Sequence, residues 1–452
     1  GGAALPLAGG RETMSRIGAA VLALWLAAGA AEAENARFSF AVLGRVRPSD
    51  SGRDAIGPGA GFVDLLRRAA ASHPEFVVVA GEAVGGSAEP DLLELQWDAF
   101  ERAAARAPGA VRVVPGTRDA AGGAAAAAWE RRRGARFFSW DRGPVHFIAL
   151  DSAQADSPGA IAGAQLAWLR ADLEKTSGVA RTFVFIHRPL WEAEASSTAW
   201  TRDVHPLLAA RRVDAVFAGA RPGFVRYPDR DGVRYLDTGG GGAELPPGLG
   251  GFPHAVLVSV APGGVKLTVL GERDEWPADV VTAAAAEAYE RALKIGTAGR
   301  ARTGEPASVA VTLRNPLAGP ARATVALDRE DSTWTADRGT VALPPGGTGT
   351  VTLRTRVGSR LFPAPRGRIT FTAGNTVLDA REFTPEVEAS NPGLIDDFED
   401  GDTTNLTGMT GVSSSSGQWY LKVDAEGAST GELGVEEAGP GGGGHKALRM
   451  RG

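Results

Sequence analysis

From Phe38 to about Arg273, short apolar runs alternate with longer stretches in which apolar residues recur every three or four positions. An apolar run of about four to eight residues is typical of a buried strand, and the longer spacing is typical of a helix that packs one face. The predicted strands are residues 38–43, 76–80, 111–114, 145–150, 182–186 and 215–218. The predicted helices include residues 61–72, 92–106 and 163–175. This alternation is typical of a layered α/β domain, which we place at residues 34–275.

The pattern changes after this domain. Residues 276–298 are rich in alanine, and their segment 278–295 predicts a helical connector. Residues 299–390 alternate Thr, Val and Arg between Gly and Pro turns, which predicts an all-β sandwich of the immunoglobulin-like type. Residues 391–452 are first acidic and then rich in Ser and Gly, and they predict part of a carbohydrate-binding-like jelly roll. Because this last segment has too few residues to close a jelly roll, we expect the chain to be a piece of a longer protein.

The N-terminal residues have the order of an export signal. Residues 14–33 contain a basic start, an apolar core and small residues before Ala33, which predicts a signal peptide cleaved after Ala33. The apolar core is shorter than the roughly 20 residues that a membrane-spanning helix needs. We therefore expect a secreted or periplasmic protein with no membrane span after cleavage. Residues 1–13 are interpreted as upstream sequence outside the folded protein.

Charge and composition narrow the chemistry that the chain can perform. A formal net charge of -5 over 452 residues is small, so we expect no global field that attracts nucleic acid and no nucleic-acid partner. The chain has no cysteine, which excludes disulfides, thiolate nucleophiles and cysteine zinc sites. Any metal site must therefore be built from histidine and carboxylate side chains.

Five short motifs lie where predicted strands end. They are Gly44-Arg45-Val46-Arg47, Gly81-Glu82, Gly116-Thr117-Arg118-Asp119, His187-Arg188-Pro189 and Gly219-Ala220-Arg221-Pro222. In their order, spacing and flanks they resemble those of the calcineurin-like metallophosphoesterases, in particular the purple-acid-phosphatase-like branch, and the resemblance covers about residues 38–270. It implies a four-layer αββα sandwich. In active members of the family, it also implies two divalent metal ions that activate water for phosphoester hydrolysis.

The positions that would bind these metals by resemblance are mostly replaced. The seven family-equivalent ligand positions are Arg45, Arg47, Glu82, Thr117, His187, Ala220 and Pro222. Only Glu82 and His187 could ligate a metal, because a guanidinium has no free lone pair and the other side chains carry no carboxylate, amide or imidazole. Arg118 stands where the resemblance implies the histidine that assists the leaving group.

We therefore predict a catalytically inactive protein with a metallophosphoesterase fold and a binding or scaffolding role. One alternative is a metal-dependent phosphoester hydrolase with Fe, Zn or Mn in an altered ligand set, for which Asp50, Asp119 and Asp151 are unexpected candidate donors. The other alternative is an extracellular polysaccharide-binding protein that acts through its C-terminal module, where Trp419 and Tyr420 are the candidate aromatic residues.

The arginines of these motifs have two interpretations. The arginines are Arg45, Arg47, Arg118, Arg188 and Arg221. They could take the place of the metals and bind a phosphate-like anion, since the guanidinium fork matches such oxyanions. They could instead pair with Glu82 and other carboxylates, because buried charges are commonly paired. His187, His146 and His205 are expected to be hydrogen-bonded structural residues.

An acidic segment begins the C-terminal module. Asp397 and Glu399 are hard oxygen donors of the kind that hold a structural calcium ion in such modules. A solvated acidic turn without a metal is the alternative. For the phosphoesterase-like domain itself we expect no cofactor.

Overall fold

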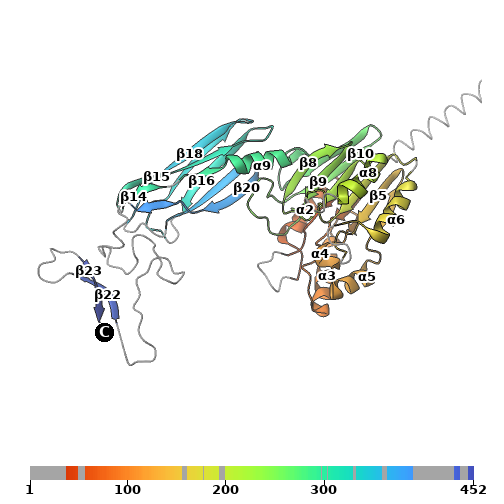
Figure 1. Ribbon diagram of the computed structural model, residues 1–452, viewed down its shortest axis with the longest axis horizontal. Helices are drawn as coiled ribbons and strands as arrows, with labels where there is room; N and C mark the ends of the chain where they lie inside the picture. The colour runs from red at the N-terminus through yellow and green to blue at the C-terminus, as the bar shows by residue number, and fades with distance from the viewer. Residues whose placement is uncertain are drawn as a thin grey trace, which may run out of the picture. The chain divides into compact units, whose positions relative to one another are not determined.

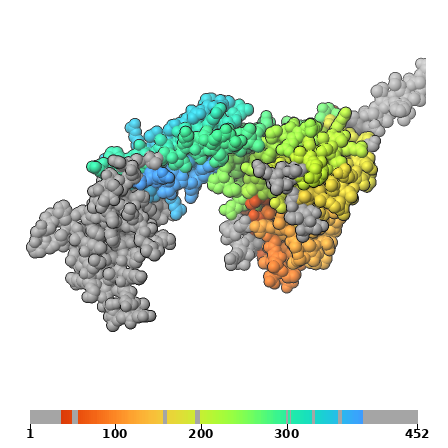
Figure 2. Space-filling model, in the orientation of Figure 1, coloured from red at the N-terminus to blue at the C-terminus, as the bar shows by residue number. Residues whose placement is uncertain are grey.

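The computed structural model describes residues 37–48, 56–154, 160–176, 178–192, 199–296, 298–302, 304–328, 332–358, 364–389, 432–437 and 446–451. The chain divides into two compact units. The first comprises Gly1–Pro246 and Phe252–Ala283, and the second comprises Pro247–Gly251 and Ala284–Gly452. In Figure 1 and Figure 2 the described residues of the first unit run from red to green, and those of the second run from green to blue. The expected connector at residues 276–298 is thus shared between the two units.

Two six-stranded sheets form the first unit (Figure 1). One sheet has the order β12 (Glu275–Pro277), β11 (Gly264–Leu270), β10 (Ala255–Ala261), β1 (Phe38–Leu43), β2 (Phe76–Val79) and β3 (Ala110–Val113). The other has the order β4 (Phe138–Arg142), β5 (Val145–Leu150), β6 (Arg181–Ile186), β7 (Ala215–Ala218), β9 (Val233–Thr238) and β8 (Phe224–Arg230). The central strands β1 to β3 are parallel, as are β5, β6, β7 and β9. Parallel strands need crossover connections, which explains the helices between them.

The strands and helices predicted from apolar spacing are confirmed. All six predicted strands are present as β1, β2, β3, β5, β6 and β7, with ends that differ by at most one residue. The predicted helices are α2 (Ala60–Ala70), α3 (Pro90–Ala104) and α6 (Gly163–Glu174). The unit also contains α4 (Thr117–Ala120), α5 (Gly123–Arg132), a π-helical turn η1 (Trp200–Val204) and α8 (His205–Ala210).

The two sheets pack face to face through phenylalanines. The ring of Phe40 on β1 lies 5.4 Å from that of Phe147 on β5 and 5.2 Å from that of Phe183 on β6. Because successive strand residues point to opposite faces, Leu43 of β1 instead joins the core that contains Phe62 of α2. Helices α6 and α8 cover the outer face of the other sheet in the same way. The described layers are therefore helix, sheet, sheet and helix, while membership of the metallophosphoesterase family stays a prediction.

The strand ends of both sheets meet in direct backbone contact. Gly44 follows β1, Ala80 follows β2 and Gly219 follows β7. A Cβ atom added at Gly219 would lie 2.2 Å from the carbonyl oxygen of Ala80. One added at Gly44 would lie 2.5 Å from the Cα atom of Gly219. Glycine is required at these positions because backbone from two sheets approaches within a distance that a side chain would occupy.

We expect Gly219→Ala to lower the free energy of unfolding by about 1–3 kcal/mol, the usual cost of forcing an extra methyl group into packed structure. The matched control is Gly263→Ala, since an added Cβ there meets no heavy atom within 4 Å. Urea denaturation of both variants, followed by tryptophan fluorescence, measures the difference. Equal stability of the two variants would contradict the close approach of the strand ends.

The second unit contains an antiparallel β-sandwich. One sheet has the order β13 (Lys294–Ile295), β15 (Pro306–Arg314) and β18 (Thr348–Arg356), and the other has the order β17 (Asp337–Leu343), β16 (Ala321–Asp328), β19 (Arg366–Ala373) and β20 (Thr376–Phe383). The buried residues alternate with exposed ones along these strands and include Val309, Leu353, Val325 and Phe371. Two further pairs are described, β14 (Gly299–Ala301) with β21 (Val387–Ala389) and β22 (Glu432–Glu437) with β23 (Lys446–Arg451). The β-sandwich predicted for residues 299–390 is confirmed as an all-β unit.

The helix predicted at residues 278–295 is shorter than expected. It is α9 (Ala283–Ala292), because Lys294 and Ile295 pair with β15 instead of continuing the helix. Tyr289 of α9 packs its ring 5.0 Å from that of Phe371, and its hydroxyl donates a 2.9 Å hydrogen bond to Asp379. Tyr289 therefore joins this helix to the core of the sandwich.

Several predictions concern residues outside the described part of the chain. These are the signal peptide at residues 14–33, the candidate donor Asp50, the candidate calcium ligands Asp397 and Glu399, and the aromatic residues Trp419 and Tyr420. Within the described part, no helix combines the length and the apolar character that a bilayer crossing requires.

Candidate functional site

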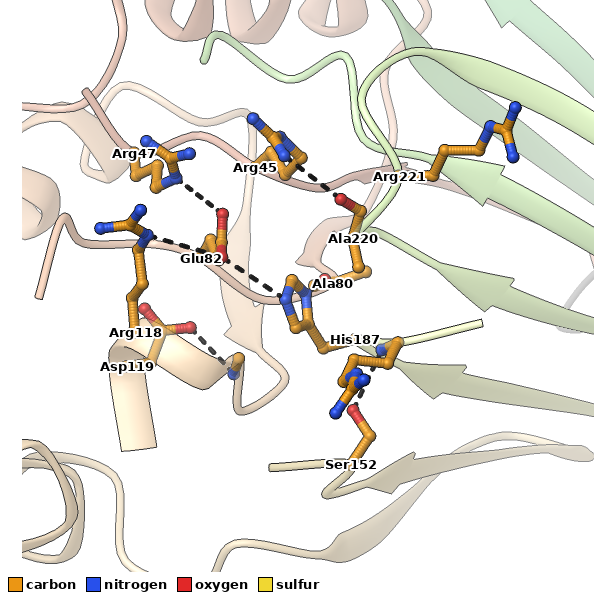
Figure 3. A network of polar contacts seen from close by, with 12 residues as sticks. Arg45, Arg47, Ala80, Glu82, Arg118, Asp119, Ser152, His187, Ala220 and Arg221 are labelled. Carbon is orange, nitrogen blue, oxygen red and sulfur yellow. Dashed lines mark hydrogen bonds and ion pairs between the residues drawn. The ribbon is translucent and has the colours of Figure 1, made fainter. Parts of the chain in front are cut away.

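The site centres on the carboxylate of Glu82, which three predicted site residues approach (Figure 3). Arg47 Nε donates a 2.7 Å hydrogen bond to Glu82 Oε2. Arg118 Nε and His187 Nε2 each lie 3.7 Å from Glu82 Oε1. Glu82 follows β2, Arg47 follows β1, Arg118 belongs to α4 and His187 follows β6, so four strand-end segments converge on one carboxylate.

Backbone hydrogen bonds hold the first two motifs side by side. The N–H of Arg45 donates to the carbonyl of Gly81 at 3.1 Å, and the N–H of Arg47 donates to the carbonyl of Glu82 at 2.9 Å. Arg45 and Glu82 have φ angles of 52° and 54°, in the left-handed region that few residues other than glycine adopt. Such backbone conformations are concentrated at functional sites, where the surrounding structure enforces them.

The environment of Glu82 favours its ionised form. Burial alone would raise the pKa of this carboxyl, but the nearby His187 ring and the hydrogen bond and charge of Arg47 outweigh burial and lower the pKa to about 2. The side chains of Arg47 and Glu82 are 4% and 12% exposed, so their contact is a largely buried ion pair. The Nδ1–H of His187 donates to the carbonyl of Ala80 at 3.1 Å, which directs the other ring nitrogen toward Glu82.

Asp119, one of the unexpected candidate ligands, holds the backbone of this site. Its fully buried carboxylate accepts hydrogen bonds from the N–H groups of Val84 and Gly116, at 3.1 and 2.9 Å. Burial raises the pKa of Asp119 to about 6. Asp151, another such candidate, is buried and ion-paired with Arg136 at 2.7 Å. Both carboxylates are therefore engaged in structural contacts.

The five arginines of the motifs do not surround one common centre. Arg45 donates to the carbonyl oxygens of Ala220 and Glu244, at 3.3 and 3.5 Å. The guanidinium of Arg221 pairs with Glu192. The backbone N–H of Arg188 donates to the hydroxyl of Ser152, and its side chain is exposed. In the described contacts Arg47 and Arg118 are the members that reach Glu82, so the predicted anion-binding set is divided into separate contacts.

These residues do not fit a centre of two divalent metals. A divalent metal needs carboxylate, amide or imidazole donors, and Glu82 and His187 are the two such groups among the seven expected positions. Glu82 already shares one oxygen with the Arg47 guanidinium. Thr117 is exposed, and Ala220 and Pro222 lie in the turn after β7 without donor side chains. Across the described ranges, no group of three or more His, Asp or Glu side chains is placed to hold a metal ion.

A cavity beside Arg118 was not anticipated from the sequence. Its volume is about 500 Å³, and its lining includes Gly85, Ser87, Thr117, Arg118 and Gly122. Arg118 Nη1 donates to the carbonyl of Gly85 at 3.0 Å. The signal that could have indicated this cavity is the pair of glycine-rich segments at Gly85-Gly86 and Gly122-Gly123, which leave space where side chains would otherwise pack.

The two other histidines in family-like segments have structural contacts, as predicted. The ring nitrogens of His146 lie 2.6 Å from Asp141 and 2.9 Å from Asp172. Those of His205 lie 2.8 Å from the Tyr235 hydroxyl and 2.9 Å from Asp231.

Comparisons with known proteins do not assign a family. No protein-family model matches the chain, and no curated protein is similar to it in sequence. Among solved structures, a CARDB domain from Pyrococcus furiosus in complex with di-metal ions is similar at 17% identity and a TM-score of 0.17, over 22% of this chain and 89% of that one. A PapD-like domain of human CEP192 is similar at 11% identity and a TM-score of 0.15, over 22% of this chain and 84% of that one. Red sea bream transglutaminase is similar at 18% identity and a TM-score of 0.18, over 30% of this chain and 18% of that one.

We expect Arg47→Met to destabilise the first unit by about 3 kcal/mol, because it leaves the Glu82 carboxylate buried without its closest cation. Arg118→Met should cost less than about 1 kcal/mol, since that side chain is 41% exposed. The double variant Arg47→Met, Glu82→Leu should recover much of the loss, because it removes both buried charges. Urea denaturation measures the free energy of unfolding of all three variants. The ion pair would not be the main stabilising contact if the two single variants lost equal stability.

Proposed function

We propose that this chain is an exported, non-catalytic protein whose metallophosphoesterase-like domain serves binding or scaffolding. The observation that carries the proposal is the buried ion pair between Arg47 and Glu82 at the end of strands β1 and β2. In the family that the sequence resembles, metals occupy this end of the sheets. Here a guanidinium fixed to the chain balances the carboxylate, and a guanidinium offers no coordination position for water or substrate.

The backbone at the site also supports this proposal. The resemblance places aspartates at positions 45 and 82, and aspartate is several-fold enriched in the left-handed region compared with most residues. Arg45 and Glu82 have left-handed φ angles although neither residue favours them. This mismatch is explained if the backbone conformation was first adopted with aspartate at both positions and was kept when the side chains changed.

The two alternative functions depend on residues that carry less support. A phosphoester hydrolase would need a second set of donors beside Glu82 and His187, while Asp119 and Asp151 are bound in structural contacts. A polysaccharide-binding role for the C-terminal module depends on residues outside the described part of the chain. Neither alternative accounts for the arginines at the ends of the strands.

We expect the purified full chain, incubated with zinc, manganese or iron and then desalted, to retain no stoichiometric metal. We also expect no turnover of an aryl phosphate ester, because the site lacks the donors that a two-metal centre requires. Metal content by elemental analysis and product absorbance measure the two outcomes. Binding of about two metals per chain, with turnover that His187→Ala abolishes, would replace the proposal with a hydrolase that has an altered ligand set.

One observation favours a second function, the binding of a phosphate-class anion. Arg118 is 41% exposed and lines the cavity together with the hydroxyl-bearing residues Ser87 and Thr117. A guanidinium and two hydroxyls supply the hydrogen-bond donors that such an oxyanion accepts.

We expect inorganic phosphate to bind the full chain with a Kd below about 1 mM, which corresponds to about -4 kcal/mol. Arg118→Gln should weaken this binding about tenfold, since it removes a charge-assisted contact. Arg67→Gln is the control, because Arg67 is an exposed residue of α2 that pairs with Asp64. Isothermal titration measures the affinities. Absence of heat, or equal affinity in both variants, would rule out the anion site.

A further inference from the structure

A second charged surface lies on the β-sandwich, far in sequence from the site above. We call it the Thr/Arg face and define it as the outward side of the sheet β13-β15-β18. Along β18, exposed and buried residues alternate, so that Thr350, Thr352, Arg354 and Arg356 share one side while Val351 and Leu353 face the core. Register places Thr312 of β15 opposite Thr350, so polar side chains of the two strands lie side by side on this surface.

The charges of this face all have one sign. Its charged residues are Lys294, Arg314, Arg354 and Arg356, and no described residue on the outward side of these strands is acidic. The described residues contain no ion pair for Lys294, Arg314 or Arg354, while Arg356 Nη1 donates to the carbonyl of Gly304. Two carboxylates lie at the edges of this face: Asp337 of β17 accepts from the backbone N–H of Arg354, and Glu305, which precedes β15, pairs with Arg302. The face therefore carries unbalanced positive charge.

The opposite outer face of the sandwich differs in its charge balance. There Arg368 pairs with Glu382 at 2.9 Å, and Arg366 lies in register with Asp328. The same fold thus exposes one sheet with mixed charges and one with cations only. Both faces therefore carry exposed arginines, and they differ because carboxylates offset part of the charge on the opposite face.

Hydroxyl groups occupy the space between the cations. The hydroxyls of Thr312 and Thr350 lie 2.8 Å apart across the two strands. Each hydroxyl can both donate and accept hydrogen bonds. Arg354 lies near one end of β18, and Arg314 is in register with Thr348 at the other end. At about 3.4 Å per residue, the cations at the two ends are separated by roughly 20 Å.

We propose that the Thr/Arg face binds an acidic polysaccharide chain. The cations match the charged groups of such a polymer, and the hydroxyls between them match its sugar hydroxyls. An extended occupant is favoured because the cations lie at both ends of the sheet. A nucleic acid is less well matched, because the outward side of the described strands carries no aromatic ring for base stacking and the whole chain has a net charge of -5. This inference does not depend on the function proposed for the first unit.

The test is the affinity of the full chain for polygalacturonate of about ten sugars at low ionic strength. The expected result is measurable binding that falls as salt is added, since exposed charges are screened. The fully methyl-esterified polymer has the same backbone without the charges, and it should not bind. The triple variant Arg314→Gln, Arg354→Gln, Arg356→Gln should bind about tenfold more weakly, as expected for the loss of three exposed ion pairs.

The matched control is Arg322→Gln, Arg338→Gln, Arg366→Gln, which removes the same charge from the opposite face. These three residues are exposed on β16, β17 and β19, and the control should keep the original affinity within about twofold. Circular dichroism verifies that both triple variants are folded. The proposal is overturned if polygalacturonate does not bind, if both triple variants lose affinity equally, or if the methyl ester binds as well as the acid. Tighter binding of a ten-nucleotide single-stranded DNA at the same face would overturn it in favour of a nucleic acid.

Discussion

The region where the strand ends of the α/β unit meet depends on one constraint, which is that the charge of Glu82 must be balanced. The carboxylate lies where strands of both sheets meet, and its side chain is only 12% exposed. A buried carboxylate without a partner would lower the free energy of unfolding by roughly several kcal/mol, so the fold must place a positive charge beside it. Arg47 supplies it because backbone hydrogen bonds hold Arg47 beside Glu82. The same backbone contacts that join the strand ends therefore also place the cation.

A cation that belongs to the chain has different consequences from a bound metal. It needs no ion from solution to balance the charge of Glu82. It also has no exchangeable coordination position at which water could be activated. Arg47 thus balances the charge of Glu82 without offering a position for a reactive water, in keeping with the binding or scaffolding role proposed above.

Much of the fold could be predicted from the sequence, because buried parallel strands read as uninterrupted apolar runs. The site could be predicted only to the level of its motifs. Arg45 and Arg47 look equivalent in sequence, and in a regular strand they would point to the same side. The left-handed φ of Arg45 breaks that alternation, so its guanidinium reaches the carbonyl of Ala220 instead of Glu82. Likewise, Glu192 draws Arg221 away, and no motif contains Glu192.

The net charge also gave an incomplete account of the electrostatics, because it does not show on which surface each charge lies. A value of -5 indicates no global attraction for anions, but it averages over surfaces that secondary structure separates. The alternation that buries Val351 and Leu353 necessarily exposes Thr352 and Arg354 on the other side of β18. The alternation of side chains along a strand therefore decides which face each charge lies on. A chain with a negative net charge can in this way expose a sheet whose outward face has no carboxylate. The sign of a local field has to be derived from strand register, for which composition is no substitute.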